Sequence, residues 1–231
     1  MIFDPILMVI AIAFMVIGII ASNRLKARFR EYSLSQISSG FSGKEVAEKM
    51  LRDSGIYDVQ VISVEGKLTD HYNPANKTVN LSHDVYNGKH VASAAVAAHE
   101  CGHAVQHATA YTWLNMRSKL VPVVNFSSKM MNFVIIGMML FAFTAHLYNQ
   151  ALLVIIALQS AIVLFSMITL PVELDASKRA LVWLEGAGIT KGQEHQKATN
   201  ALRWAASTYV IAALAAITTL IYFIMQYNSR K

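Results

Sequence analysis

The sequence predicts a mainly α-helical membrane protein with four transmembrane helices and a small α+β region that faces the cytoplasm. Hydrophobic residues make up 55% of the 231 residues and charged residues only 15%, whereas soluble domains carry about 25% charged residues. Four apolar runs are close in length to the transmembrane helices of membrane proteins, which need about 20 residues to cross a bilayer. They cover Ile2–Ala21, Met130–Ala145, Leu152–Leu170 and Tyr209–Met225.

The first apolar run indicates a signal anchor rather than a cleaved secretory signal. It begins with Asp4 instead of basic residues, it has no clear small-x-small cleavage site, and Arg24 and further basic residues follow at once. Twelve of the 20 Lys and Arg fall between Arg24 and Lys119, and five more fall between Lys178 and Arg203. Because basic loops stay in the cytoplasm, we expect a multi-pass protein of the inner (plasma) membrane with both termini outside.

This orientation divides the chain into five parts. We expect a transmembrane helix at 1–23, a cytoplasmic region at 24–121, a transmembrane hairpin at 122–171, a cytoplasmic helical region at 172–207, and a last transmembrane helix with a short tail at 208–231. The net charge of +6 then faces mostly the anionic inner leaflet. Because no basic patch is interleaved with aromatic residues, we expect no nucleic-acid partner. The oligomeric state stays open.

Short-range patterns locate the elements of the first cytoplasmic region. Ser42 and Glu45 form a capping-box pattern before a helix that Gly55 can end. Apolar and polar residues alternate over 57–64 and again over 77–81, which predicts a small sheet of two or three strands. A second helix is expected from near Val91 to His107, and its stretch is rich in alanine.

An H-E-x-x-H run covers residues 99–103, within this second helix. Because residues four apart share a helix face, His99 and His103 can reach one metal ion. Glu100 lies beside that face, where it can take a proton from a water molecule on the metal. Cys101, the single cysteine, excludes an internal disulfide. It points to the opposite side of the helix, so we expect a small buried side chain rather than a ligand.

A catalytic metal site needs a third ligand, for which the sequence offers three candidates. Glu173 directly follows the third apolar run, where an unpaired carboxylate is costly. Asp175 competes with it, but two residues apart on a helix they face different ways. His107 extends the histidine face, yet three ligands along one straight helix do not easily converge. Two imidazoles and a carboxylate favour zinc, although they also suit manganese, iron or cobalt.

Three segments of the sequence also resemble those of a known protein family. The H-E-x-x-H run, the segment 72–86 and the segment 170–177 look like those of the bacterial neutral zinc metallopeptidases of the inner membrane, the YugP-like group. The likeness covers nearly the whole chain. It is more distant to the HtpX and CAAX prenyl protease peptidases, which are gluzincins. The resemblance implies that the cytoplasmic catalytic region is zincin-like and that the cofactor is zinc.

The resemblance also implies roles for individual residues. His99, His103 and Glu173 would be the metal ligands, and Glu100 would be the catalytic base. The distant relatives carry a Glu-x-x-x-Asp pattern, and Ser177 stands here where their Asp would be. This departure changes the group that can hold a ligand histidine by a hydrogen bond.

The predicted function is therefore zinc-dependent hydrolysis of peptide bonds at the cytoplasmic membrane face, with protein or peptide substrates close to the bilayer. Glu100 would take the proton of the attacking water and pass it to the leaving amine. An extended substrate could pair with the strand Lys77–Leu81, although an ordinary core strand explains the same pattern equally well. The donor that stabilises the oxyanion stays open among four residues, which are Tyr72, His71, Arg179 and His195.

Three other interpretations compete with this function. A non-proteolytic membrane assembly or quality-control factor could keep the metal for structure alone. An intramembrane protease would need the motif inside the bilayer, but Val91–Ala110 carries Glu100 and three histidines, which makes insertion unfavourable. A transporter would need charged residues along a path, and the four apolar runs hold almost none.

Overall fold

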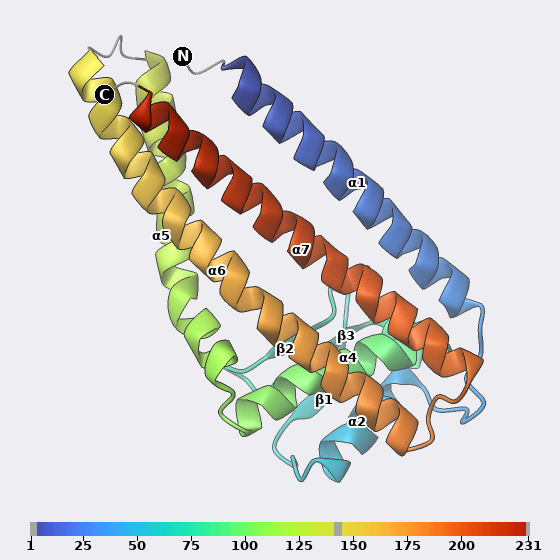
Figure 1. Ribbon diagram of the computed structural model, residues 1–231. Coiled ribbons are helices and arrows are strands. Elements are labelled where there is room, and N and C mark those ends of the chain that lie inside the picture. The colour runs from blue at the N-terminus through green and yellow to red at the C-terminus, as the bar shows by residue number, and fades with distance from the viewer. Residues whose placement is uncertain (1–3, 141–144, 230–231) are drawn as a thin grey trace. The chain divides into compact units, whose positions relative to one another are not determined.

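A computed structural model describes residues 4–140 and 145–229. It is mainly helical and contains one small sheet (Figure 1). Part of the second apolar run, residues 141–144, lies outside the described residues. The elements in chain order are α1 (Pro5–Ser33), α2 (Gly43–Asp53), β1 (Gln60–Val64), β2 (His71–Asn73), β3 (Thr78–Ser82), α3 (His83–Asn87), α4 (Val91–Ala108), α5 (Thr112–Leu140), α6 (Ala145–Gly186) and α7 (Gln193–Asn228).

Within residues 4–140 and 145–229, four helices are long and apolar enough to cross a membrane, as the composition predicts. They are Pro5–Ser33, Thr112–Met138, Leu147–Gly186 and Gln193–Asn228. Helices α5 and α6 continue through Pro122 and Pro171, so neither proline ends its helix. Contacts between backbone atoms divide the chain into two compact units. One unit comprises Met1–Ile20, Met116–Leu170 and Thr208–Lys231, and it contains the apolar parts of these four helices.

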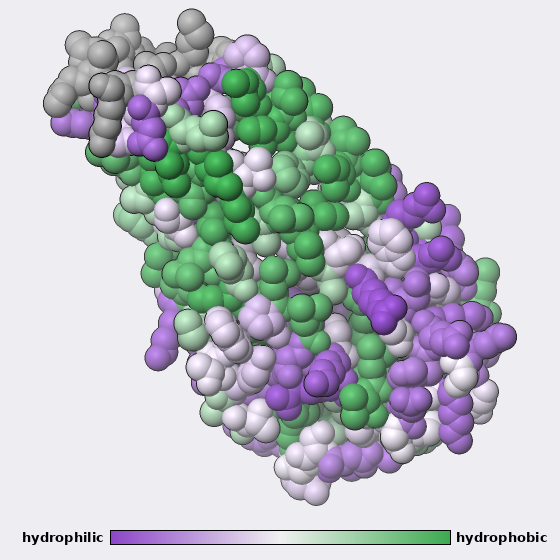
Figure 2. All heavy atoms as spheres, in the orientation of Figure 1, coloured by the Kyte–Doolittle hydropathy of each residue, from purple (hydrophilic) through white to green (hydrophobic). Residues whose placement is uncertain are grey.

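Within this apolar unit, hydrophobic side chains cover the helix surfaces (Figure 2). The side chains of Ile6 and Ile20 on α1 are both more than half exposed, which suits contact with lipid rather than with water. Helices α6 and α7 are joined by a buried polar contact, in which Gln159 Nε2 donates to the carbonyl of Ala216 at 3.0 Å. A hydrogen bond of this kind satisfies a polar side chain inside an apolar environment.

The second unit comprises Ala21–Asn115 and Pro171–Ser207 and contains the sheet. Its strand order is β1-β3-β2, with β1 and β3 parallel and β2 and β3 antiparallel. All five residues of β3 are buried. The two strands that alternation predicts are present, and β2 is the third. Because β3 has a strand on each side, the idea that a substrate pairs with Lys77–Leu81 is wrong: no backbone edge of β3 is left to accept one.

The core of this unit gathers between α2, α4 and β3. The amphipathic stripe of α2 is buried, and the predicted capping box is present: the Ser42 side chain accepts from the Glu45 backbone N–H, and the Glu45 carboxylate accepts from the Ser42 N–H. Reciprocal capping of this type stabilises a helix start by about 1 kcal/mol. The Cys101 thiol is fully buried against α2 and donates to the Ala47 carbonyl at 3.5 Å. This confirms the expected buried cysteine.

Candidate metal centre

Helix α4 carries three of the candidate residues, and its small side chains let it lie deep in the unit. Ala94, Ala95, Ala97 and Ala98 are fully buried. The helix begins at a reciprocal cap, in which the His90 ring accepts from the Ser93 N–H at 3.0 Å. Alanine favours the helix and removes the bulk that would hold neighbouring elements away.

The third candidate ligand reaches α4 because helix α6 approaches α4 very closely. A Cβ atom added to Gly102 would lie 2.6 Å from the carbonyl oxygen of Ala176. No real Cβ tolerates that distance, so only glycine permits the approach. Ala176 is three residues after Glu173, so the close contact lies about one helical turn from that carboxylate.

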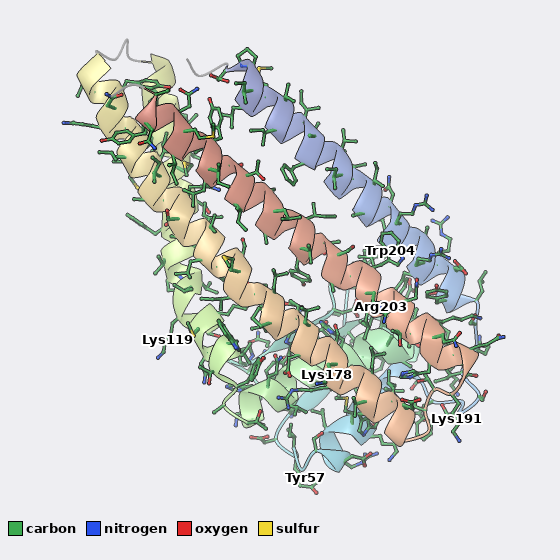
Figure 3. All side chains as sticks on the ribbon, viewed as in Figure 1. Tyr57, Lys119, Lys178, Lys191, Arg203 and Trp204 are labelled. Atoms are coloured by element: carbon green, nitrogen blue, oxygen red, sulfur yellow. The ribbon has the colours of Figure 1, made fainter. Side chains whose placement is uncertain are left out.

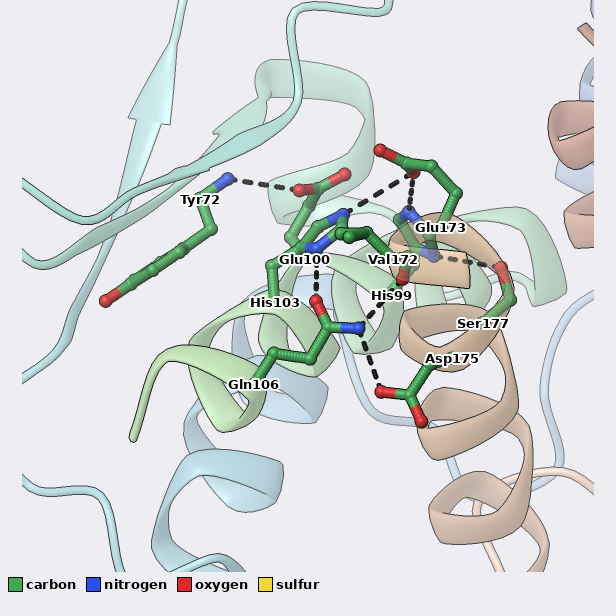
Figure 4. Close-up of polar contacts among 9 residues, drawn as sticks. All are labelled: Tyr72, His99, Glu100, His103, Gln106, Val172, Glu173, Asp175 and Ser177. Carbon is green, nitrogen blue, oxygen red and sulfur yellow. Dashed lines mark hydrogen bonds and ion pairs between the residues drawn. The ribbon is translucent and has the colours of Figure 1, made fainter. Parts of the chain in front are cut away.

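The two helices bring three possible ligand atoms together. Glu173 Oε2 lies 3.3 Å from His99 Nε2 and 3.6 Å from His103 Nε2. One ligand atom from each of the three residues falls within 4.8 Å of the others. The two imidazole rings are nearly perpendicular, with their centroids 4.8 Å apart. Figure 4 shows both rings directed toward the Glu173 carboxylate.

This donor set fits a zinc ion. Catalytic zinc sites use three protein ligands from imidazole and carboxylate groups and keep one position open. Glu173 and His103 are buried, with only 3% and 8% of their surface exposed. A carboxylate buried this deeply needs a cationic partner, which a divalent ion would supply. His99, His103 and Glu173 are therefore the residues that could hold the metal.

The other nitrogen of each imidazole is held by a neutral side chain. His99 Nδ1 lies 3.1 Å from Ser177 Oγ, and His103 Nδ1 lies 3.0 Å from Gln106 Oε1. A proton on Nδ1 leaves the lone pair on Nε2, which is the form that binds a metal. Ser177 thus offers a hydroxyl to His99.

Gln106 is the partner that the sequence did not point out. Its side chain is fully buried, and its amide nitrogen donates to Val172 O at 2.8 Å and to Asp175 Oδ2 at 2.9 Å. Because both of these partners are acceptors, the amide oxygen must face His103, so His103 Nδ1 carries the proton. One side chain therefore ties a possible ligand on α4 to the turn of α6 that carries Glu173. A glutamine three residues after the second histidine, and so close to it on the helix surface, was the available signal.

Glu100 lies beside the histidine pair and is oriented by the sheet. Its Oε2 accepts a hydrogen bond from the backbone N–H of Tyr72, on β2, at 3.0 Å. Strand β2 is in turn tied to the end of β3, because the Asp70 carboxylate accepts from the Ser82 N–H at 2.7 Å. Burial raises the pKa of the Asp70 carboxyl. Glu100 extends from α4, and Figure 4 shows its carboxylate between the Tyr72 N–H and the Glu173 carboxylate.

The two remaining candidates for the third ligand, His107 and Asp175, have other partners. The His107 ring accepts from or donates to the Tyr72 hydroxyl at 2.9 Å and does not join the cluster. Asp175 accepts from Gln106 and from Arg179, whose Nε lies 2.6 Å from Asp175 Oδ2. The structure therefore brings Glu173, and neither His107 nor Asp175, to the two histidines.

The four candidate oxyanion donors also contact other groups. The Tyr72 ring points away from the histidine pair (Figure 4), and its hydroxyl lies 2.9 Å from His107 Nδ1. His71 Nδ1 lies 2.7 Å from the Thr69 carbonyl, and the His195 ring contacts Thr190 Oγ1 at 3.2 Å. Arg179, the fourth candidate, is held by Asp175. Of this group, Tyr72 is linked to the site, and the link is its backbone N–H rather than its side chain.

The negative charges in the cluster favour the protonated form of the His103 imidazole. Burial alone would lower the pKa of the His103 imidazole, but the hydrogen bond with Glu173 and the negative charges of Glu100 and Glu173 outweigh it and raise that pKa. For the Cys101 thiol, two residues away, burial acts in the other direction and raises the pKa well above the ordinary value. That thiol stays protonated, which disfavours a role as nucleophile or ligand.

Comparison with known proteins identifies the family of the chain. Residues 7–228 match the family described as "Putative neutral zinc metallopeptidase". The chain is 40% identical over 205 residues to the "Putative membrane protease YugP" of Bacillus subtilis (strain 168), and the match covers 89% of each protein. No solved structure matches. Because the family match covers almost the whole chain, the chain belongs to the putative neutral zinc metallopeptidases.

Proposed function

We propose that this protein is a zinc-dependent metalloendopeptidase that hydrolyses peptide bonds at the cytoplasmic face of the membrane. The observation that carries the proposal is the convergence of His99, His103 and Glu173, with ligand atoms within 4.8 Å of one another, beside a carboxylate on Glu100. The family and the YugP relative support a protease. The four apolar helices support a membrane location.

The residues have complementary roles in this reaction. A zinc ion held by His99, His103 and Glu173 would supply a Lewis acid, which polarises a carbonyl and lowers the pKa of water toward about 7. Glu100 accepts the proton of the attacking water and returns it to the leaving amine. The Tyr72 N–H keeps the Glu100 carboxylate oriented toward the cluster. Glu100 is 8% exposed, and limited access of water strengthens these electrostatic interactions.

The substrate backbone has an available edge in β2. The described residues pair β2 with β3 along one side only. The Tyr72 N–H on the other side points to Glu100. An extended peptide beside this outer edge would lie next to the catalytic carboxylate. Because the Tyr72 N–H already donates to Glu100, the Tyr72 carbonyl is the group left to accept a main-chain hydrogen bond from the peptide, without demanding a particular side chain.

Replacement of one carboxylate tests the proposed chemistry. In Glu100→Gln we expect stoichiometric zinc and a rate of casein cleavage at least 100-fold below wild type, because the ligands remain while the base is lost. Glu48→Gln is the matched control, since Glu48 is a partly exposed glutamate on α2, outside the cluster, that pairs with Lys44 at 3.7 Å. It should cleave casein at the wild-type rate. Undiminished cleavage by Glu100→Gln would remove Glu100 from its role.

A non-proteolytic assembly or quality-control factor is the alternative. In that case zinc would stabilise the fold, and the biological function would persist in Glu100→Gln. Zinc analysis of the purified protein, combined with complementation of a deletion strain by Glu100→Gln, separates the two functions. Complementation with zinc present favours the assembly factor, and loss of complementation with zinc present favours the protease.

The orientation in the membrane follows from the charge distribution. We propose that residues 24–121 and 172–207 lie in the cytoplasm, that the helices of 1–23, 122–171 and 208–231 cross the inner membrane, and that both termini are outside, because 17 of the 20 Lys and Arg fall between Arg24 and Lys119 or between Lys178 and Arg203. Tags fused to either end should react with a membrane-impermeant reagent in intact cells. Tags that react only after lysis would reverse the orientation.

A further inference from the structure

A cavity in the unit that contains the sheet is lined by basic and apolar side chains. It encloses about 600 Å³. We call it the basic cleft, and define it by the residues that line it: Lys26, Phe29, Arg30 and Ser33 of α1, Lys67 and Leu68 of the β1–β2 connection, and Ser82 and Asp84.

Three cations of the basic cleft lack an acidic partner within the described residues. The ion pairs found there do not include Lys26, Arg30 or Lys67. The neighbouring Arg28 differs, because it pairs with Glu31 at 2.6 Å and so uses the acid nearest in sequence to Lys26 and Arg30. Asp84 is the one acid of the cleft. Three cations that share one cavity with one acid repel each other, and a bound anion would relieve this repulsion.

Apolar groups lie beside these charges. Phe29 is partly buried and packs against the core, with its ring edge-on to His90 at 6.4 Å between centroids. Leu68 is 49% exposed and has a φ of 59°. A left-handed backbone is uncommon for leucine, so the connection holds this apolar side chain at the cleft against its own preference. The cleft therefore suits an anion that also carries apolar groups.

The place of the cleft along α1 favours a lipid. The exposed apolar side chains of α1 extend to Ile20. At a rise of 1.5 Å per residue, Lys26 follows about 9 Å and Arg30 about 15 Å further along the helix. The polar headgroup layer on each side of the hydrocarbon core is roughly 5–8 Å thick. Because long basic side chains can extend back toward the bilayer, the first of these cations reaches headgroup depth.

We propose that the basic cleft binds the headgroup of an anionic phospholipid, with Lys26, Arg30 and Lys67 around the phosphate and Phe29 and Leu68 against the apolar part. A free phosphate ion shares the charge but has no use for the two apolar side chains. Binding would fasten the β1–β2 connection to α1. This site is separate from the metal centre and does not depend on the proposed protease activity.

The test measures lipid binding by the full-length protein in detergent. Native mass spectrometry would count phosphatidylglycerol or phosphatidylcholine molecules retained by each chain. We expect one phosphatidylglycerol on wild type, no comparable retention of phosphatidylcholine, and at least tenfold weaker phosphatidylglycerol binding by Lys26→Gln/Arg30→Gln/Lys67→Gln. Inorganic phosphate at millimolar concentration should not displace the lipid.

A matched variant controls for the loss of three positive charges. Arg52→Gln/Lys191→Gln/Arg203→Gln removes the same charge at exposed positions outside the cleft, two of which are labelled in Figure 3. It should bind phosphatidylglycerol as wild type does. Lys67→Gln alone, in an exposed connection, guards against misfolding and should weaken binding measurably. Equal lipid binding by the cleft variant and the control variant, or displacement of the lipid by phosphate, would overturn the proposal.

Discussion

Replacement of Gln106 by leucine should uncouple the second histidine from the helix that carries Glu173. The side chain is fully buried and makes three hydrogen bonds, with His103 Nδ1 at 3.0 Å, Val172 O at 2.8 Å and Asp175 Oδ2 at 2.9 Å. Leucine has a similar volume but no polar atom, so Gln106→Leu removes these bonds with little change in packing.

The magnitude follows from the groups that lose their partner. The His103 N–H would be left buried without an acceptor, and the Asp175 carboxylate would lose one donor; each loss costs about 1–3 kcal/mol. The Val172 carbonyl keeps the hydrogen bond of its own helix. Burial of the apolar leucine offsets about 1–2 kcal/mol of this cost. We therefore expect a net loss of roughly 1–4 kcal/mol in the free energy of unfolding. Loss of a group that orients a ligand histidine typically weakens metal binding by about 10–100-fold.

Two measurements on the same protein separate these effects. Zinc affinity is measured by competition with a chelator, and stability by thermal unfolding of the metal-free protein. Gln159→Leu is the matched control, because Gln159 is another buried glutamine that donates to a backbone carbonyl, 3.0 Å away, on the same helix as Glu173. It lies about 21 Å before Glu173 along the helix axis. Gln159→Leu should lower stability and leave zinc affinity unchanged.

One outcome for the two glutamine variants would contradict a positioning role of Gln106. If Gln106→Leu loses stability as Gln159→Leu does but binds zinc within twofold of wild type, then the hydrogen bond to His103 does not position the imidazole. The role of Gln106 would then be limited to packing and to satisfying buried polar groups.

Three further predictions concern the same centre. Glu173→Ala should lose most of its zinc, as measured by metal analysis, and stoichiometric zinc would point to another ligand. Gly102→Ala places a Cβ 2.6 Å from the Ala176 carbonyl, so unfolding should occur at lower temperature by an amount that corresponds to about 1–3 kcal/mol; an unchanged midpoint would mean that the helices can separate freely. The His103 pKa is raised in the metal-free protein, so its contribution to stability is complete below its ordinary pKa of 6.5 and is lost as pH rises through the raised value. Thermal unfolding of metal-free wild type and His103→Gln should therefore differ more at pH 5.5 than at pH 8.5, and a constant difference would contradict this.

Local patterns in the sequence determined most of the elements. The lengths of the apolar runs predict four membrane-spanning helices, since a bilayer sets the length of a span, and the part of the chain that the structure describes has four helices long and apolar enough to span. The capping box at Ser42, the alternation in β1 and β3 and the helical stretch around residues 99–103 depend on neighbours within about four residues. Each of these features is present in the structure.

The tertiary structure decided what the sequence left open. Glu173, Asp175 and His107 were all candidates, and the choice depends on where α6 crosses α4, which the close contact of Gly102 with Ala176 permits. Strand pairing decided that β3 is central and that β2 presents Tyr72 to Glu100. These outcomes depend on contacts between residues far apart in the chain, which helical periodicity, strand alternation and spacing do not encode.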